Sequence, residues 1–188
     1  MNIAVISAST RINRQSHRVA LGLAQFIENR RHTAGILDLA AYNFPIMEEV
    51  YHRHPNPPEG LADFSQKIKD ADAFIFVSPE YNGTYTSALK NAVDYLKENE
   101  FNKKVIGIVS VSAGGLGGIR AALSMQQLVL GVGGFAIPQM LPVGNVAARF
   151  DEEGQLTDPV FERSINVFLD AFLWLAEAVA EKKAIISV

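Results

Sequence analysis

The sequence predicts one α/β domain, residues 1–188, in which a parallel sheet is covered by helices on both faces. Short apolar runs alternate with helix-length amphipathic stretches, which is typical of βαβ units. The run at 73–77 is apolar throughout, as expected for a strand at the centre of a parallel sheet. A chain of 188 residues is long enough for one such domain with a substantial core and too short for two of ordinary size.

The first half of the chain predicts three strands and three helices. Apolar runs predict strands at Ile3–Ser7, Gly35–Leu39 and Ala73–Val77. Amphipathic periodicity predicts helices at Ser16–Arg30, Leu61–Asp70 and Thr86–Glu98. Four prolines interrupt the pattern between Ala40 and Gly60, so a long loop is expected there.

The second half predicts two more strands and two more helices. The strands are expected at Lys104–Val111 and Gly134–Ile137. The helix Ile119–Leu130 is apolar on more than one side, a pattern that fits burial against its own sheet and against a second subunit. The last helix is expected to start at Asp158-Pro159, an N-cap acid followed by proline, and to run to about Glu181.

Composition argues against several function classes. A formal net charge of −3 gives no electrostatic reason to expect nucleic acid or an anionic membrane as a partner. The chain has no cysteine, which removes disulfides, thiolate nucleophiles and Fe–S clusters. No secretory signal or membrane-length apolar run is found, so a cytoplasmic location is expected. Glu48, Glu49, His52 and His54 are expected to be solvated on their proline-rich loop, so no metal site is predicted.

The loop at 9–16, between the first strand and the first helix, predicts an anion site. It ends at a helix N-terminus, where free N–H groups and the helix dipole favour negative charge. The loop's side-chain donors and cations are Ser9, Thr10, Arg11, Arg14, Gln15 and Ser16. It is neither a Walker loop nor a dinucleotide fingerprint, because the required glycines and lysine are missing. The alternative is that Ser16 only caps the helix and the arginines are solvated.

The loop at 79–83 follows the most apolar strand. Tyr81 offers a planar face on which a flat ligand can stack, and Gly83 permits turns that are closed to other residues. The alternative is an ordinary strand-to-helix turn with Thr84 or Thr86 as the N-cap.

A third loop, residues 112–118, follows the fourth strand and contains four glycines. Such a loop allows the backbone to approach a ligand closely and to present its N–H groups. Flexibility alone is the alternative explanation. In an open α/β sheet all three loops would meet beyond the carboxyl ends of the strands, where ligands bind.

Taken together, the three loops resemble those of the NAD(P)H-dependent FMN reductase family of flavodoxin-like proteins, which includes quinone, azo-dye and chromate reductases. The resemblance is carried by Ala8-Ser9-Thr10-Arg11, by Pro79-Glu80-Tyr81-Asn82-Gly83 and by the glycine-rich loop, with weaker similarity continuing through the last helix. It implies a flavodoxin-like three-layer sandwich whose five-stranded parallel sheet has the order 2-1-3-4-5.

The resemblance also implies roles for individual residues. Ser9, Arg11, Gln15 and Ser16 would hold the FMN phosphate, and Pro79, Glu80, Tyr81, Asn82 and Gly83 would border the ribityl chain and the ring. Ser112, Ala113 and Gly114 would face the polar edge of the ring, and Thr10 and Gly115 belong to the same cofactor-binding set. Ala8 replaces a glycine of many members. Arg14 lies in a longer form of the first loop and could contact either FMN phosphate or the nicotinamide cofactor.

The implied activity is hydride transfer from NADPH or NADH, through bound FMN, to a quinone, azo compound, metal oxyanion or free flavin. No catalytic side chain is expected. The protein is expected to be a homodimer or homotetramer. The alternative is a flavodoxin-like electron carrier or flavin-binding regulatory module that does not oxidise NAD(P)H. The modest net charge argues against a carrier, because carriers tend to be strongly acidic for docking.

Overall fold

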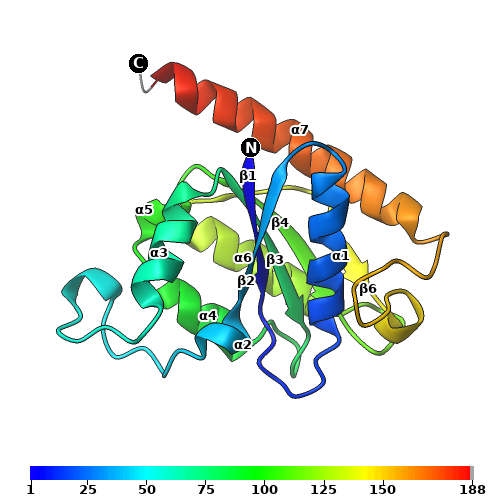
Figure 1. Ribbon diagram of the computed structural model, residues 1–188, viewed down its shortest axis with the longest axis horizontal. Helices are drawn as coiled ribbons and strands as arrows, with labels where there is room; N and C mark the ends of the chain where they lie inside the picture. Colours follow the sequence, from blue (N-terminus) through cyan, green and yellow to red (C-terminus); the bar gives the residue numbers. More distant parts are fainter. Residues whose placement is uncertain (187–188) are drawn as a thin grey trace.

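A computed structural model of the protein describes residues 1–186, without the side chains of Glu98, Asn99 and Ile186. Its centre is a parallel sheet in which the strands follow the order β2-β1-β3-β4-β5 (Figure 1). The strands of the long part of the sheet are β1 (Asn2–Ser7), β2 (Thr33–Asp38), β3 (Ala73–Pro79) and β4 (Val105–Val111). The predicted fold class and strand order are confirmed.

The fifth position of the sheet is divided between two short strands. β5 (Phe135–Ala136) pairs with the beginning of β4, and β6 (Leu141–Val143) pairs with its end. The sequence predicted one strand at Gly134–Ile137 and missed β6. Pro138 follows directly and has no N–H to give to a ladder, so the chain leaves the sheet before pairing with β4 again.

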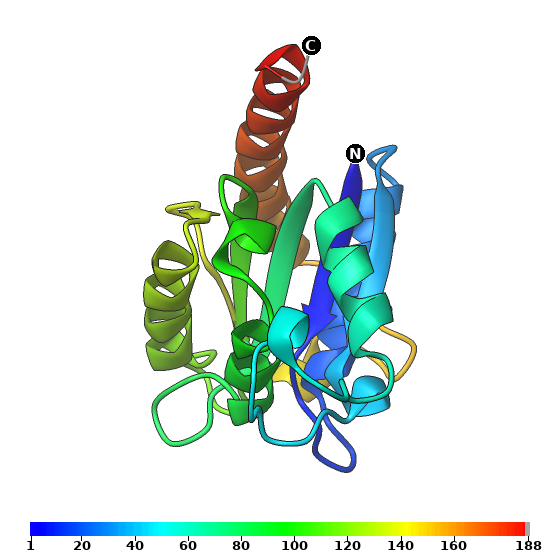
Figure 2. The same ribbon diagram turned by 90° about the vertical axis from the view of Figure 1, so that its left-hand side faces the viewer.

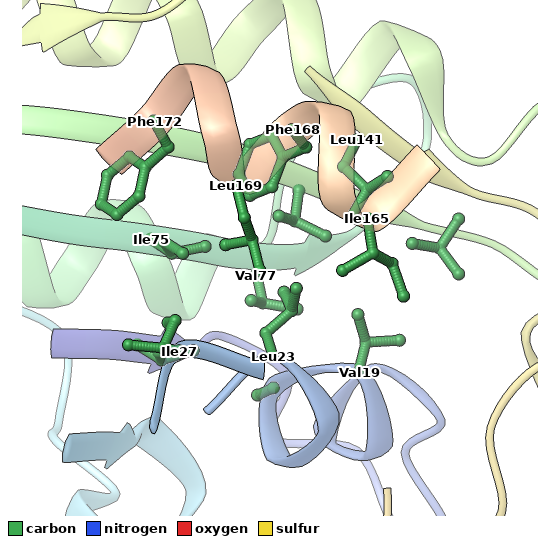
Figure 3. Packing of buried hydrophobic residues seen from close by; sticks show 14 of the residues in the cluster. Val19, Leu23, Ile27, Ile75, Val77, Leu141, Ile165, Phe168, Leu169 and Phe172 are labelled. Carbon is green, nitrogen blue, oxygen red and sulfur yellow. The ribbon is translucent and has the colours of Figure 1, made fainter. Parts of the chain in front are cut away.

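Helices cover both faces of the sheet because alternate strand residues point to opposite faces. On one face α1 (Ser16–Glu28) and α7 (Glu162–Ile186) pack over a shared core, in which their side chains meet Ile75 and Val77 of β3 (Figure 3). The opposite face is covered by α3 (Leu61–Asp70), α4 (Ser87–Asp94) and α6 (Ile119–Gly131) (Figure 2).

Several predicted helix and loop boundaries differ from the structure. The first helix, expected to reach Arg30, ends at Glu28. The helix predicted to end at Glu98 ends at Asp94, and a short separate helix, α5 (Glu98–Phe101), follows. The segment predicted as a loop contains α2 (Leu39–Tyr42) and a 3₁₀ turn at Tyr51–Arg53.

The last helix differs at both ends, because it continues beyond the expected Glu181 to Ile186 and begins later than expected. Regular α7 begins at Glu162, and Asp158 instead caps the preceding turn by accepting a hydrogen bond from the N–H of Val160 at 3.1 Å. None of the helices that the structure describes combines the length and the apolar character needed to cross a bilayer.

Candidate functional site

The three loops predicted from the sequence meet at one edge of the sheet, because β1, β3 and β4 are parallel and end there. They enclose a pocket of ≈ 350 Å³, within the range of small-molecule sites. The predicted residues that line it are Ser9, Arg11, Arg14, Gln15, Ser16, Pro79, Glu80, Tyr81, Ser112 and Ala113. Thr10 lines a neighbouring hollow instead. Asn82, Gly83, Gly114 and Gly115 are in the same loops but outside the lining.

The N-terminus of α1 contains two buried polar atoms without partners. Ser16 is the first residue of the helix, and Gln15 is its N-cap without a side-chain cap bond. Ser16 Oγ and Gln15 Oε1 are buried and have no hydrogen-bond partner among the described residues. The alternative that Ser16 serves as the helix cap is therefore wrong. A buried hydroxyl without a partner costs roughly 1–3 kcal/mol, a cost that a bound oxyanion would offset.

A phosphate group fits the chemistry of this helix end. The hydroxyl of Ser16 is a donor, and half a turn of the Gln15 amide exchanges its buried oxygen for an N–H₂ donor. The free N–H groups of the first helical turn add further donors, and the helix dipole adds partial positive charge.

Ser9 joins the first loop to the second. Its hydroxyl is 2.9 Å from the hydroxyl of Tyr81, and it also accepts a bond from the N–H of Arg11 at 3.4 Å. The guanidinium of Arg11 lies 5.6 Å from the centre of the Tyr81 ring. Among the described residues, Arg11 has no carboxylate partner, so its positive charge is available to a ligand in the pocket.

Arg14 is held inside the protein. Its guanidinium forms a two-pronged ion pair with the carboxylate of Asp38, at the end of β2, and donates to the carbonyl of Ser9 at 2.9 Å. Burial alone would raise the pKa of Asp38, but hydrogen bonds from Arg14 and from the N–H of Ala40 outweigh it and hold this pKa below its usual value. The carboxylate is therefore charged at neutral pH, and Arg14 braces the loop.

His17 lies beneath the same loop, with Nδ1 3.0 Å from the hydroxyl of Ser7. Burial and the nearby charge of Arg14 lower the pKa of His17, so its ring is neutral at pH 7. No role was expected for His17 or Asp38 from the sequence. Their positions could have indicated a role at the site, because His17 is the second residue of the first helix and Asp38 lies at the end of the second strand.

The second loop is a tight turn that also starts a helix. The backbone N–H groups of Tyr81 and Thr84 donate to each other's carbonyls at 2.9 and 3.2 Å, and Asn82 and Gly83 both have positive φ, as a type I′ turn requires. Thr86 caps α4 by accepting from the N–H of Leu89. The ordinary-turn alternative is thus confirmed for Thr86, while Tyr81 of the same loop lines the pocket.

Glu80 connects the second loop to the third. Its carboxylate accepts a bond from Nε of Arg120 at 2.9 Å and from the backbone N–H groups of Arg120 and Ala121 at 3.2 and 3.4 Å. These amides form the N-terminus of α6, so a carboxylate of the chain already occupies that helix end. The predicted contact of Glu80 with a flavin stays a prediction.

The third loop presents backbone to the pocket. A methyl group at Gly114 or Gly115 would enter open space, whereas at Gly117 it would come within 2.7 Å of Pro142. The N–H groups of residues 113–116 have no hydrogen-bond partner in the part of the chain that the structure describes. This loop therefore offers uncharged donors to a ligand, in contrast to the cationic first loop.

Comparison with known proteins identifies the family. Residues 1–148 match the family model described as NADPH-dependent FMN reductase. The chain belongs to this family. The predicted enzyme class, the FMN cofactor and NADPH as reductant are therefore confirmed as those of the family to which the chain belongs.

Named relatives of this FMN reductase agree with the assignment. A quinone reductase of Pseudomonas putida is 30% identical over 179 residues, which cover 91% of this chain and 92% of the relative. An NADPH azoreductase of Bacillus sp. is 29% identical over 160 residues, covering 85% of this chain and 86% of the relative. The structure of FerB, a flavoenzyme NAD(P)H:(acceptor) oxidoreductase of Paracoccus denitrificans, has the same fold, with a TM-score of 0.78, 23% identity and coverage of 94% and 97%.

Proposed function

We propose that this FMN reductase binds FMN in the pocket between its three loops and passes hydride from NADPH to a quinone or an azo compound. The observation that carries the proposal is the α1 N-terminus, where the buried Ser16 Oγ and Gln15 Oε1 have no partner among the described residues. Both atoms belong to residues that line the pocket together with Tyr81 and Ala113.

The charged and the uncharged donors of the pocket would contact different parts of the cofactor. Arg11, Ser16 and the free amides of α1 would hold the phosphate, with Arg14 fixing the loop through Asp38. The amide of Ala113, the residue of this group that lines the pocket, would donate to the uncharged polar edge of the ring. FMN held by these residues would supply the hydride-transfer chemistry between the nicotinamide and the acceptor. The chain binds and orients the reactants, and no side chain is assigned a proton transfer.

Two observations support the finer parts of the proposal. Relatives are named as quinone reductase and azoreductase, which favours these two acceptor classes over a metal oxyanion or free flavin. Leu123 and Leu130 of α6 are 51% and 68% exposed, which supports the second subunit expected on this helix. The cytoplasmic location stays a prediction.

The direct test is a visible spectrum of the purified protein followed by anaerobic titration with NADPH. We expect a flavin spectrum that bleaches with NADPH and is restored when a quinone or an azo dye is added. A flavin-loaded protein that leaves NADPH untouched would be an electron carrier or regulatory module. A protein that stays colourless after FMN is added would refute the proposed site.

A further inference from the structure

The outer face of α7 carries large apolar side chains that the rest of the chain does not cover. Val167, Trp174 and Ile185 are 55%, 73% and 70% exposed, and Ala178 between them is also exposed. The inner face of the same helix supplies Phe168 and other residues to the core (Figure 3). A helix that is apolar on two opposite sides has one surface more than its own sheet can bury.

The spacing of these residues is symmetric. From Val167 the stripe continues after seven residues to Trp174, after four to Ala178 and after seven to Ile185. The intervals 7, 4 and 7 read the same from either end, and their centre is residue 176. At 1.5 Å per residue the stripe is roughly 27 Å long. A two-fold interface requires such self-complementarity, because each residue must meet the symmetric position of the partner.

An antiparallel copy of α7, placed on the two-fold axis at residue 176, gives a complementary register. Trp174 meets Ala178 of the partner subunit, a large side chain against a small one, and Val167 meets Ile185 of the partner subunit. Asp170 meets Lys182 of the partner subunit, so opposite charges face each other twice. Within one chain, Asp170 is 72% exposed at 3.7 Å from Arg30. Lys182 forms no ion pair with the described residues.

We propose that the outer face of α7 is an interface between two copies of this chain, which pair their helices antiparallel about residue 176. The end of α7 projects past the body of the molecule, so a partner helix can lie along it (Figures 1 and 2). Residues 181, 182, 184 and 185 of this projecting end are exposed. The partner's Val167 would cover Ile185, which has little of its own chain beneath it.

The flanking charges favour a second copy over a membrane surface. Membrane-surface helices border their apolar face with lysine and arginine. The stripe on α7 is bordered instead by both signs of charge, with Asp170, Glu177 and Glu181 beside Arg163 and Lys182. The C-terminal end of α7 lies at the opposite end of the sheet from the first loop (Figure 1). Combined with a subunit contact on α6, this pairing would produce a homotetramer.

The experiment uses Trp174, the one tryptophan of the sequence, as a reporter of its own burial. Sedimentation and tryptophan emission of the FMN-loaded protein are measured over a range of protein concentrations. We expect the emission maximum to move to longer wavelength on dilution, together with a halving of the mass. Val167→Glu and Ile185→Glu should each raise the dissociation constant of this step at least about tenfold, because a charge would be buried against an apolar side chain.

Charge reversal decides whether the register is right. Asp170→Lys should weaken pairing, and adding Lys182→Asp to the same chain should restore both the mass and the blue-shifted emission. Leu130→Glu, on the exposed face of α6, is the matched control and should leave the emission of Trp174 unchanged. An emission maximum that does not depend on protein concentration, or a double reversal that does not recover pairing, would each overturn the proposal. Emission that shifts only when anionic vesicles are added would assign the stripe to a membrane surface and overturn it too.

Discussion

Replacing Arg14 by alanine should destabilise the protein itself, whereas replacing Arg11 should weaken only the hold on FMN. Arg14 is joined to the carboxylate of Asp38 by two hydrogen bonds and to the carbonyl of Ser9 by a third. The guanidinium of Arg11 lies over the ring of Tyr81 and forms no ion pair with the residues that the structure describes. Arg11 and Arg14 are three residues apart in the sequence, but we expect Arg14 to stabilise the fold and Arg11 to bind the ligand.

The size of the stability loss in Arg14→Ala follows from the burial of the Arg14–Asp38 ion pair. The side chains of Arg14 and Asp38 are 18% and 22% exposed. Exposed ion pairs contribute about 0–1 kcal/mol and the loss of one partner of a buried pair costs about 3–5 kcal/mol, so a loss of roughly 2 kcal/mol is expected here. For a chain of this size that corresponds to a fall in Tm of about 4–8 °C.

The pH dependence of this loss has a definite sign. The native pKa of Asp38 lies below its usual value of 3.8, so the pair stabilises the protein fully above that value and ceases to do so as the pH falls through the native pKa. The difference in Tm between wild type and Arg14→Ala should therefore be complete at pH 7 and shrink below about pH 4. Scanning fluorimetry of the flavin-free protein over this range measures it.

Binding provides the matched comparison. Arg11→Ala should raise the Kd for FMN roughly 10- to 100-fold by removing a charge-assisted bond to phosphate, and should leave the weaker binding of riboflavin unchanged. Its Tm without flavin should equal that of the wild type. If Arg14→Ala loses FMN more readily than Arg11→Ala while its Tm does not move, Arg14 is the phosphate ligand and the assignment of the two residues is reversed.

Three further predictions concern the same edge of the sheet. Ser16→Ala should raise the Kd for FMN about tenfold in a fluorescence titration without lowering the Tm of the flavin-free protein, because the lost hydroxyl has no partner there. Gly117→Ala should lower the free energy of unfolding by about 2 kcal/mol in urea, since φ is +64 and the methyl would lie 2.7 Å from Pro142; Gly115→Ala, with open space at that position, should not. His17 has a lowered native pKa, so stability should decline as the pH falls below about 6.5, and His17→Gln should reduce that decline.

The sequence predicted the fold wherever one kind of periodicity continues for the length of an element. The strand at 73–77 is buried on both faces and reads as an unbroken apolar run, so no other element fits it. The edge strand β6 was harder to predict, because Leu141–Val143 is only three residues long and contains a proline. What makes it a strand is its pairing with Val109–Val111, which is tertiary and not local.

The site was predicted at the level of loops rather than of contacts. Residue types and their positions at strand ends sufficed to bring Ser9, Tyr81 and Ser112 to one pocket. The hydrogen-bond and ion-pair partners of the site residues could not be predicted in the same way. Whether Arg14 meets a ligand or Asp38 depends on β2 lying next to β1, and the role of Glu80 depends on where α6 begins.

The two helix ends at this edge explain why a flavin would bind in only one direction. The N-terminus of α6 is already occupied by the carboxylate of Glu80, so a phosphate placed there would meet a like charge at close range. The N-terminus of α1 has no acidic residue in its first turn, and it has buried donor-capable side chains and the charge of Arg11 nearby. In the proposed site a dianionic phosphate would therefore lie at α1, which would leave the uncharged end of the cofactor for the amide of Ala113. In the proposed site, the ion pair of Glu80 with Arg120 would thus influence the orientation of the ligand without contacting it.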